Sequence, residues 1–231
     1  MLTVSVIVPV YNEQETVIKL LTEVRRQKLD GVRFEVVVID DGSRDDTRAL
    51  LEQNPNLYDI FIKQPQNQGK GAAVLAGLQK ASGQYILFQD ADLEYSPSHY
   101  KVLLHPVQEF GADIVMGSRF MAAQYVRVQF YWHMIGNKFI TTLFNVFFNT
   151  TFTDIYTCYL LYRRDLVQPA QLKTRGWEQH AEILCCAVRN AKAIYEVPIS
   201  YHGRSYEEGK KIKAIHVWPV IFTILRCRIF G

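Results

Sequence analysis

Three carboxylates occupy alternating positions in the stretch QDADLEYSP at residues 89–97. They are Asp90, Asp92 and Glu94, and they come directly after the apolar run YILF at residues 85–88. Alternate side chains of an extended segment point the same way, so we expect the three to converge in front of a strand end. Carboxylate oxygens are the ligands that hard cations prefer. The stretch therefore predicts a site for a hard cation.

Three other polar clusters lie beside predicted strands or helices. PVYNE at 9–13 follows one β-branched run, DDGS at 40–43 follows a second, and NQGKG at 67–71 precedes a helical pattern. Ligands of mainly parallel α/β sheets bind outside the carboxyl ends of the strands. We therefore expect these clusters and the three carboxylates to line one crevice. No G-x-G-x-x-G follows the first run and no Ser or Thr follows Lys70, so neither a dinucleotide fingerprint nor a P-loop is indicated.

The elements that must position these clusters alternate along the first 120 residues. Apolar runs predict strands, and helical periodicity or capping patterns predict the helices between them. The predicted strands are residues 4–8, 34–39, 60–63, 85–89 and 114–117, and the predicted helices are residues 16–26, 43–52, 70–81 and 96–110. Strands that alternate with helices imply an α/β fold, with a mainly parallel sheet and helices on both faces.

Composition limits the class of protein. The chain has 231 residues, of which 48% are hydrophobic and 21% charged, which is typical of a folded globular protein. Its net charge is only +3, but from Arg204 onward six Lys or Arg stand against two Glu, which indicates either an anionic partner or a solvated basic face. The four cysteines show no C-x-x-C spacing and no signal segment is recognised, so a cytoplasmic protein is expected.

In order and spacing, the motifs resemble those of the family 2 glycosyltransferases of GT-A fold. The stretches that carry the resemblance are VIVPVYNE, VVVIDDGSRDDT, NQGKGAA, DADLE, GSRF and EVPISYHGRSYEEGKK. Within that family the chain looks like the dolichyl- or polyprenyl-phosphate hexose synthases. The resemblance implies a Rossmann-like GT-A domain at residues 1–213 and an amphipathic helix at 214–231. It also implies inverting transfer of a hexose from GDP-mannose or a UDP-hexose to a polyprenyl phosphate.

The resemblance assigns a set of positions to the sugar nucleotide. They are Pro9, Tyr11, Glu13, Asp40, Asp41, Lys70, Asp90 and Ala91. The first three would border the base and ribose, and Asp40 or Asp41 would accept hydrogen bonds from N–H groups of the base. For Lys70, a solvated position at the start of a helix is an equal alternative.

The same resemblance assigns Asp90, Asp92 and Glu94 to a Mg²⁺ or Mn²⁺ ion. Such a cation bridges the diphosphate of a sugar nucleotide and offsets the charge that develops as the glycosidic bond breaks. Relatives often carry Gln at the position of Glu94, so Asp92 is the firmer expected ligand.

A phosphate acceptor is anionic, so basic side chains are expected to bind and position it. A monophosphate has a second pKa of ~6, so it is largely dianionic at pH 7 and needs no strong general base. The resemblance places Arg119, Arg204 and Lys210 at the acceptor phosphate, with Lys211 beside them. The expected catalytic residues are Asp92, Arg119, Arg204 and Lys210.

Two alternatives to hexose transfer onto a lipid phosphate remain open at this stage. Glu178, His180 and Glu182 lie where the chain departs from the family pattern, and they are candidates for contacts with the sugar or the acceptor. If the acceptor were a sugar hydroxyl of a growing glycan, Glu178 or Glu182 would be the candidate base. A non-catalytic nucleotide-sugar-binding subunit would keep the same fold.

Two aromatic and apolar segments favour a membrane surface. Residues 125–149 and the tail IHVWPVIFTILRCRIF combine aromatic side chains with a few cations, a pattern of interfacial segments, although core or dimer contacts would also explain it. We expect a peripheral protein on the cytosolic face of a membrane. It could bind there as a monomer, as a homo-oligomer or with an anchoring subunit. The expected partners are a sugar nucleotide and a lipid phosphate, and no nucleic acid.

Overall fold

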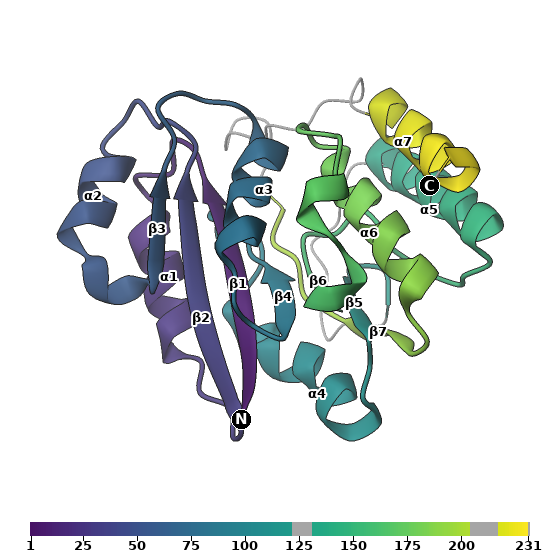
Figure 1. Ribbon diagram of the computed structural model, residues 1–231, viewed down its shortest axis with the longest axis horizontal. Coiled ribbons are helices and arrows are strands. Elements are labelled where there is room, and N and C mark those ends of the chain that lie inside the picture. The colour runs from purple at the N-terminus through teal and green to yellow at the C-terminus, as the bar shows by residue number, and fades with distance from the viewer. Residues whose placement is uncertain (122–130, 204–216, 231) are drawn as a thin grey trace.

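A single sheet organises the molecule. The computed structural model describes residues 1–121, 131–203 and 217–230 (Figure 1). Within these residues the chain builds a seven-stranded sheet of order β3-β2-β1-β4-β6-β5-β7. The strands are β1 (Leu2–Val10), β2 (Val32–Asp40), β3 (Ile60–Lys63), β4 (Tyr85–Phe88), β5 (Ile114–Ser118), β6 (Leu160–Arg163) and β7 (Ile194–Pro198). Only β6 runs antiparallel to its neighbours in this sheet, so the predicted mainly parallel α/β fold is confirmed.

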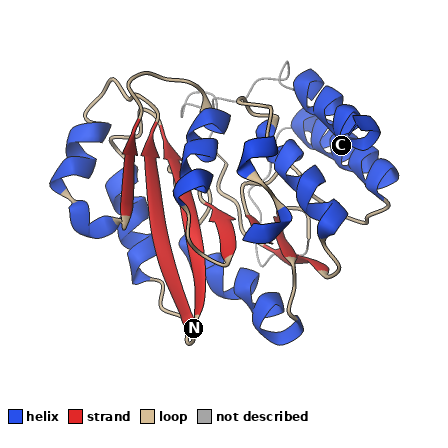
Figure 2. Ribbon diagram, viewed as in Figure 1, coloured by secondary structure: helices blue, strands red, loops and turns tan. Residues whose placement is uncertain are grey.

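Helices cover both faces of the sheet (Figure 2). They are α1 (Val17–Arg26), α2 (Thr47–Gln53), α3 (Lys70–Lys80), α4 (Tyr100–Phe110), α5 (Tyr131–Phe148), α6 (Gln179–Asn190) and α7 (Val217–Phe230). Single-turn 3₁₀ helices are described at Pro55–Leu57, Pro97–His99, Arg164–Leu166 and Pro169–Gln171. Helix α3 packs on β1 and β2 on the face toward the viewer, and α1 lies behind them (Figure 1).

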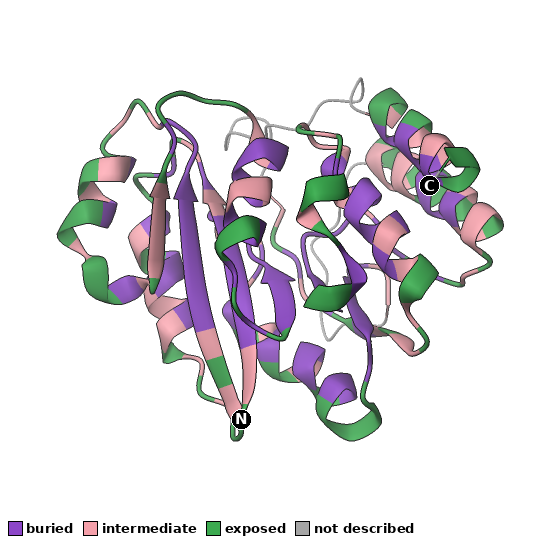
Figure 3. Cartoon of the chain, in the orientation of Figure 1, coloured by how far each residue is buried: buried purple, intermediate pink, exposed green. Residues whose placement is uncertain are grey.

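The parallel pairing of β1 with β2 sets the position of the first polar clusters. The register runs from Leu2 opposite Val32 to Val10 opposite Asp40, so both strands end at the same edge of the sheet. Most residues of the two strands are buried, as expected for central strands covered on both faces (Figure 3). The segments that follow Val10 and Asp40 therefore meet at one edge.

The last helices form a separate cluster at the right of Figure 1. Helix α7 packs against α6 and α5, and it buries Val220, Thr223, Ile224 and Cys227. None of the helices that the structure describes has the length and hydropathy needed to cross a bilayer.

Candidate active site

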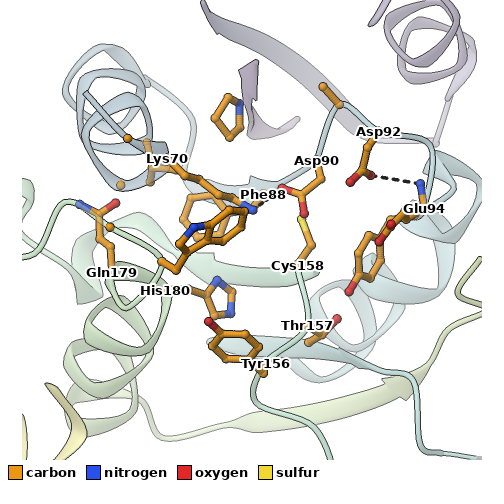
Figure 4. Close-up of a pocket in the computed structure, with 18 of the residues that line it drawn as sticks. Lys70, Phe88, Asp90, Asp92, Glu94, Tyr156, Thr157, Cys158, Gln179 and His180 are labelled. Atoms are coloured by element: carbon orange, nitrogen blue, oxygen red, sulfur yellow. Dashed lines mark hydrogen bonds and ion pairs between the residues drawn. The ribbon is translucent and has the colours of Figure 1, made fainter. Parts of the chain in front are cut away.

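A cavity of about 520 Å³ opens at the carboxyl ends of β1, β2 and β4 (Figure 4). All four polar clusters contribute to its wall. Their residues in the wall are Pro9, Val10, Tyr11, Glu13, Asp41, Asn67, Gly69, Lys70, Gly71, Asp90, Ala91, Asp92 and Glu94. The predicted single crevice is therefore confirmed, and it is positioned by the parallel strands as expected.

Two neighbouring aspartates at the end of β2 have different surroundings. Asp40 is fully buried and pairs with Arg48 of α2, with 2.5 Å between Oδ2 and Nε. Asp41 lines the cavity, and its two carboxylate oxygens accept the backbone N–H groups of Gln68 and Gly69 at 2.8 and 2.9 Å. Burial raises the pKa of Asp41 in spite of these bonds. Asp40 thus fastens α2, and Asp41 is the aspartate of the pair that a ligand in the cavity would meet.

The first turn of α3 is held close to the segment that precedes α6. A Cβ atom at Gly71 would lie 2.4 Å from the backbone carbonyl carbon of Arg175, so only glycine permits this approach. The backbone N–H of Ala72 donates to the Arg175 carbonyl oxygen at 3.1 Å. This contact brings Gly176 and Trp177 to the cavity wall.

Lys70, the first residue of α3, faces the cavity. Its Nζ lies 2.5 Å from Oδ1 of Asp90, and the ring centroid of Trp177 is 5.2 Å from Nζ (Figure 4). Burial opposes the charged form of Lys70, but the Asp90 carboxylate outweighs burial and raises the pKa of Lys70. In the same way burial disfavours ionised Asp90, but Lys70 lowers the pKa of Asp90. Both groups are therefore charged at neutral pH, and Lys70 does not point into bulk solvent.

The expected convergence of three carboxylates is wrong, because the segment after β4 turns instead of remaining extended. Leu93 has a φ of 61°, in the left-handed region. Oδ1 of Asp92 accepts the backbone N–H of Glu94 at 3.1 Å, and Oε2 of Glu94 accepts the hydroxyl of Tyr201 at 2.5 Å. The turn sends the three carboxylates to different partners, although all of them line the cavity.

The cavity wall fits a divalent cation that takes only one or two of its ligands from the protein. Among the described residues, no group of three or more His, Cys, Asp or Glu side chains could hold a metal ion. Mg²⁺ usually binds one or two carboxylates together with substrate phosphates and water, and it needs no cage made of protein. Asp92, which lines the cavity at this turn, would be such a carboxylate; Asp90 pairs with Lys70, and Glu94 accepts the Tyr201 hydroxyl. The donor set therefore fits a cation that arrives with a diphosphate.

Arg119 lines the cavity from the end of β5 and is anchored beneath it. Its Nε and one Nη donate to the two carboxylate oxygens of buried Asp154 at 2.7 and 2.9 Å, and the same Nη also donates to the Tyr156 carbonyl oxygen at 2.9 Å. Its guanidinium carbon lies 5.1 Å from the ring centroid of Tyr201. Burial opposes the charge of Arg119, but Asp154 outweighs it and raises the pKa of the guanidinium. The arrangement holds a permanent cation at the cavity.

The candidates on α6 separate into two groups. His180 lines the cavity, with its ring centroid 6.0 Å from that of Phe88. Glu182 is buried outside the cavity wall, where it accepts the backbone N–H groups of Lys173 and Thr174 and pairs with Arg226 of α7 at 2.5 Å. Glu182 therefore lies away from any nucleophile in the cavity, and it ties α7 to the segment before α6.

Glu178 also lies outside the cavity wall, and its Oε1 accepts the backbone N–H of Gly176 at 3.3 Å. The structure thus brings neither of the two candidate bases, Glu178 and Glu182, to the cavity. Arg204, Lys210 and Lys211 lie outside the described residues.

Several residues of the wall were not among the site candidates named from the sequence. They include Thr157, Cys158, Trp177, Gln179 and Tyr201. Trp177 and Gln179 flank Glu178, so the departure from the family pattern at 177–182 was a usable signal. Thr157 and Cys158 directly precede β6, and the long-range pairing of β6 with β4 places that segment beside the carboxyl end of β4.

Residues 5–169 match the family model described as glycosyl transferase family 2. Because that match spans more than half of the 231 residues, the chain belongs to glycosyltransferase family 2. The predicted family is therefore confirmed.

Three curated relatives are named as sugar transferases, and two of those names include a lipid phosphate. The chain is 27% identical over 216 residues to the dolichol-phosphate mannosyltransferase of Pyrococcus furiosus, covering 90% of this chain and 58% of that protein. It is 30% identical over 229 residues to the undecaprenyl-phosphate 4-deoxy-4-formamido-L-arabinose transferase of Proteus mirabilis, covering 97% and 67%. The low-salt glycan biosynthesis hexosyltransferase Agl6 of Haloferax volcanii is 28% identical over 206 residues, covering 89% and 49%. The chain thus spans about half to two thirds of the length of these relatives.

A solved structure shares the fold. Glucosyl-3-phosphoglycerate synthase from Mycobacterium tuberculosis, in complex with Mn²⁺, UDP and phosphoglyceric acid, superposes with a TM-score of 0.72 at 20% identity, covering 100% of this chain and 80% of that one. The predicted GT-A fold is confirmed by this likeness.

Proposed function

We propose that the protein transfers a hexose from a sugar nucleotide to a polyprenyl phosphate at a membrane surface, with inversion and with Mg²⁺ or Mn²⁺ as cofactor. Family membership and the relatives named for dolichol-phosphate and undecaprenyl-phosphate support glycosyl transfer of this kind. GDP-mannose and UDP-hexoses are the proposed donors, and the cytosolic leaflet is the proposed location.

One observation carries the proposal: the cavity continues from the strand ends to α5 and α7, two helices that expose several large hydrophobic side chains. Trp132, Gly136 and Ile140 of α5 and Val217 of α7 belong to the same wall as Asp41 and Asp92. A donor held at the strand ends and an acceptor reaching in from α5 and α7 would therefore meet in one cavity. This arrangement suits an acceptor with a polar head and a long apolar tail.

The α5–α7 apolar surface is defined by the large hydrophobic side chains that these two helices expose. They are Tyr131, Trp132, Ile135, Phe139 and Val146 on α5, and Trp218, Phe222, Ile229 and Phe230 on α7. The two helices contain Lys138, Arg226 and Arg228 and no Asp or Glu. Aromatic and aliphatic side chains with basic neighbours suit the interface of an anionic bilayer.

The proposed reaction needs no base from the protein. The base and ribose of the donor would lie against Pro9, Tyr11 and Asp41, and Lys70 would meet the negative charge of the donor. A phosphate oxygen of the acceptor attacks the anomeric carbon, the bond from that carbon to the diphosphate oxygen breaks, and the nucleoside diphosphate leaves with the electron pair. Arg119 orients the acceptor phosphate by charge-assisted hydrogen bonds. When bound, the divalent cation would act as a Lewis acid on the leaving diphosphate, held by Asp92.

The proposal is tested by incubating the protein with Mg²⁺ or Mn²⁺, a short polyprenyl phosphate and one of several GDP- or UDP-sugars. We expect the release of nucleoside diphosphate to depend on the polyprenyl phosphate. Hydroxyl acceptors such as oligosaccharides serve as the comparison. Transfer to them alone would favour the glycan-extending alternative.

Membrane binding gives a first prediction. The double variant Trp218→Ser/Phe222→Ser is expected to lower the partition onto vesicles of phosphatidylglycerol and phosphatidylcholine at least about tenfold, because burying each aromatic side chain contributes roughly 1.5–3 kcal/mol. Both residues are exposed on α7 and neither lines the cavity. Co-sedimentation with the vesicles measures the effect.

The control for this experiment is Phe110→Ser. Phe110 is 60% exposed on α4, which lies away from α5 and α7 in Figure 1. Its replacement is expected to leave vesicle binding unchanged. An equal loss of binding in the control, or no vesicle binding by the original protein, would refute the assignment of this surface.

Glu182 gives a second prediction, because the glycan-extending alternative had named it as a base. Glu182→Gln is expected to lower the free energy of unfolding by about 2 kcal/mol, since it weakens charge-assisted hydrogen bonds to Thr174 and Arg226. The midpoint of thermal unfolding should fall by roughly 5 °C. Turnover per folded molecule should stay within about twofold, which a lost general base would not allow because such a base contributes 10²–10⁴-fold.

The matched control is Glu52→Gln, which removes the exposed partner of Lys63. A surface ion pair of this kind contributes about 0–1 kcal/mol, so little change in the unfolding midpoint is expected. A drop in turnover of 100-fold or more in Glu182→Gln, with normal stability, would restore the base assignment.

A further inference from the structure

Three hydrogen bonds dock the segment that follows β7 on the residues that follow β4. The hydroxyl of Tyr201 donates to Oε2 of Glu94 at 2.5 Å, and the backbone N–H of His202 donates to the Glu94 carbonyl oxygen at 3.1 Å. The backbone N–H of Ser200 donates to Nε2 of His99 at 3.1 Å. In the sheet, β6 and β5 lie between β4 and β7. The three bonds therefore join two strand ends that are not neighbours in the sheet.

The docked Glu94 in turn fixes the orientation of the Asp92 carboxylate. Oδ1 of Asp92 accepts the backbone N–H of Glu94 at 3.1 Å (Figure 4). Leu93, between the two, has a left-handed φ of 61°, a conformation that a residue with a side chain keeps only where the surrounding structure holds it. The bonds from Tyr201 and His202 to Glu94 supply such a hold.

The ring of Tyr201 lies beside the cation of Arg119. The guanidinium carbon is 5.1 Å from the ring centroid, which is within the range of a cation–π interaction. The Tyr201 side chain is buried, and its ring packs on that of Tyr95 with 4.9 Å between centroids. A Cβ atom at Gly203 would lie 2.5 Å from a carbon of the Tyr201 ring, so the backbone of Gly203 lies directly against the ring. These contacts give the ring one position, with its hydroxyl at the carboxylate turn.

We propose that Tyr201 is a positioning residue that sets the spacing between the turn at Asp92–Glu94 and the guanidinium of Arg119. The inference rests on the proposed function, in which Asp92 lies on the side of the leaving diphosphate and Arg119 on the side of the acceptor phosphate. Asp92, Arg119 and Tyr201 line the same cavity. A misplacement of reacting groups by about 1 Å can cost about 100-fold in rate, so a rigid link between the two sides has catalytic value.

The two contacts of Tyr201 can be removed separately. Tyr201→Phe keeps the ring beside Arg119 and loses the hydroxyl that donates to Glu94. Tyr201→Leu loses both contacts. The hydroxyl is therefore expected to affect the donor side of the reaction, and the ring is expected to affect the acceptor side.

The donor side is tested by calorimetry on the full chain with UDP and GDP, each with and without Mg²⁺. For the nucleotide that the original protein binds more tightly, Tyr201→Phe is expected to weaken binding about threefold to tenfold with Mg²⁺, the effect of one lost hydrogen bond. Without Mg²⁺ the change should stay within about twofold, because the orientation of Asp92 matters mainly to a bound cation. The double variant Glu94→Ala/Tyr201→Phe should bind no more weakly than Glu94→Ala alone, because both changes remove the same chain of contacts.

The acceptor side is tested by initial rates with a short polyprenyl phosphate. Tyr201→Phe is expected to lower kcat about tenfold and to leave the KM for polyprenyl phosphate within about twofold, because Arg119 keeps its ring contact. Tyr201→Leu should in addition raise that KM about fivefold, since the cation–π contact is lost. A purely structural role would lower the amount of folded protein without separating kcat from KM in this way.

Tyr85→Phe is the matched control. Tyr85 and Tyr201 are each 8% exposed, and the Tyr85 hydroxyl donates to the Ala112 carbonyl oxygen at 2.9 Å, away from the cavity wall. This variant also loses one hydrogen bond of a buried tyrosine, so its unfolding midpoint should fall about as much as that of Tyr201→Phe. Its kcat and its Mg²⁺-dependent nucleotide binding should match those of the original protein.

Three results would overturn the inference while the proposed function stands. They are additive losses in the double variant, the same loss of nucleotide binding with and without Mg²⁺, and an equal loss of kcat in the Tyr85 control. If the original protein showed no turnover that depends on polyprenyl phosphate, the proposed function would be overturned, and the inference with it.

Discussion

Asp92→Asn is expected to lower turnover by at least about 100-fold, because losing the carboxylate of a Lewis-acid site removes several kcal/mol of stabilisation of the leaving group. Asp92 lies on the cavity wall at the turn after β4, where its Oδ1 accepts the backbone N–H of Glu94. Affinity for the nucleoside diphosphate should fall strongly with Mg²⁺ present and little without it. Calorimetry with and without Mg²⁺ measures this difference.

Glu94→Gln is the matched variant. The Gln side chain keeps a carbonyl oxygen that can accept the Tyr201 hydroxyl, so a loss of less than about tenfold is expected, corresponding to roughly 1 kcal/mol. Normal turnover of Asp92→Asn would exclude the proposed cation site. If Glu94→Gln were the more damaged variant, the roles assigned within the turn would have to be exchanged.

Arg119→Met gives the second large effect, on stability as well as on catalysis. It leaves the fully buried Asp154 carboxylate without its bidentate partner, and breaking a buried pair in this way costs about 3–5 kcal/mol. That loss is a large part of the ~5–15 kcal/mol that stabilises a typical domain. The midpoint of thermal unfolding should fall by roughly 10 °C, as measured by calorimetry or circular dichroism.

A double variant separates the two roles of Arg119. Arg119→Met/Asp154→Leu removes both charges, and replacing a buried ion pair by apolar side chains is often neutral, so most of the lost stability should return. Turnover with polyprenyl phosphate should stay low, because the cation that orients the acceptor is still missing, while binding of the sugar nucleotide is kept. Recovery of turnover together with stability would show that Arg119 acts only as a structural partner of Asp154.

The fold was predicted well from the sequence where a strand has a strong local apolar pattern. Runs such as 4–8 and 34–39 are rich in Val and Ile, with Ser5 and Glu35 as their polar members. Such runs are typical of central parallel strands buried on both faces, and these two lie within β1 and β2. The polar clusters after them converge because parallel strands end at one edge. β6 and β7 were not predicted, since they lie beyond the strand–helix alternation of the first 120 residues and join the sheet by long-range pairing with β4 and β5.

The site was predicted less completely, because long-range contacts decide the role of each side chain. Asp40 and Asp41 are adjacent and chemically identical, and the pairing of Asp40 with Arg48 distinguishes them. The alternation of carboxylates after β4 suggested a common direction, but the left-handed backbone at Leu93 changes it. Glu182 matches a family position by sequence, and its contact with Arg226 is visible only once α7 is in place.

The most direct test of the account follows the anomeric carbon. The protein would be given Mg²⁺ and its preferred sugar nucleotide labelled with ¹³C at C1, together with equal amounts of a short polyprenyl phosphate and the matching phosphate-free polyprenol. The lipid product would be extracted and examined by mass spectrometry and NMR. We predict one labelled lipid, a polyprenyl phosphate hexose whose C1 resonance is split by ³¹P. A labelled lipid without phosphorus coupling, formed on the polyprenol hydroxyl, would contradict the claim that the nucleophile is a phosphate.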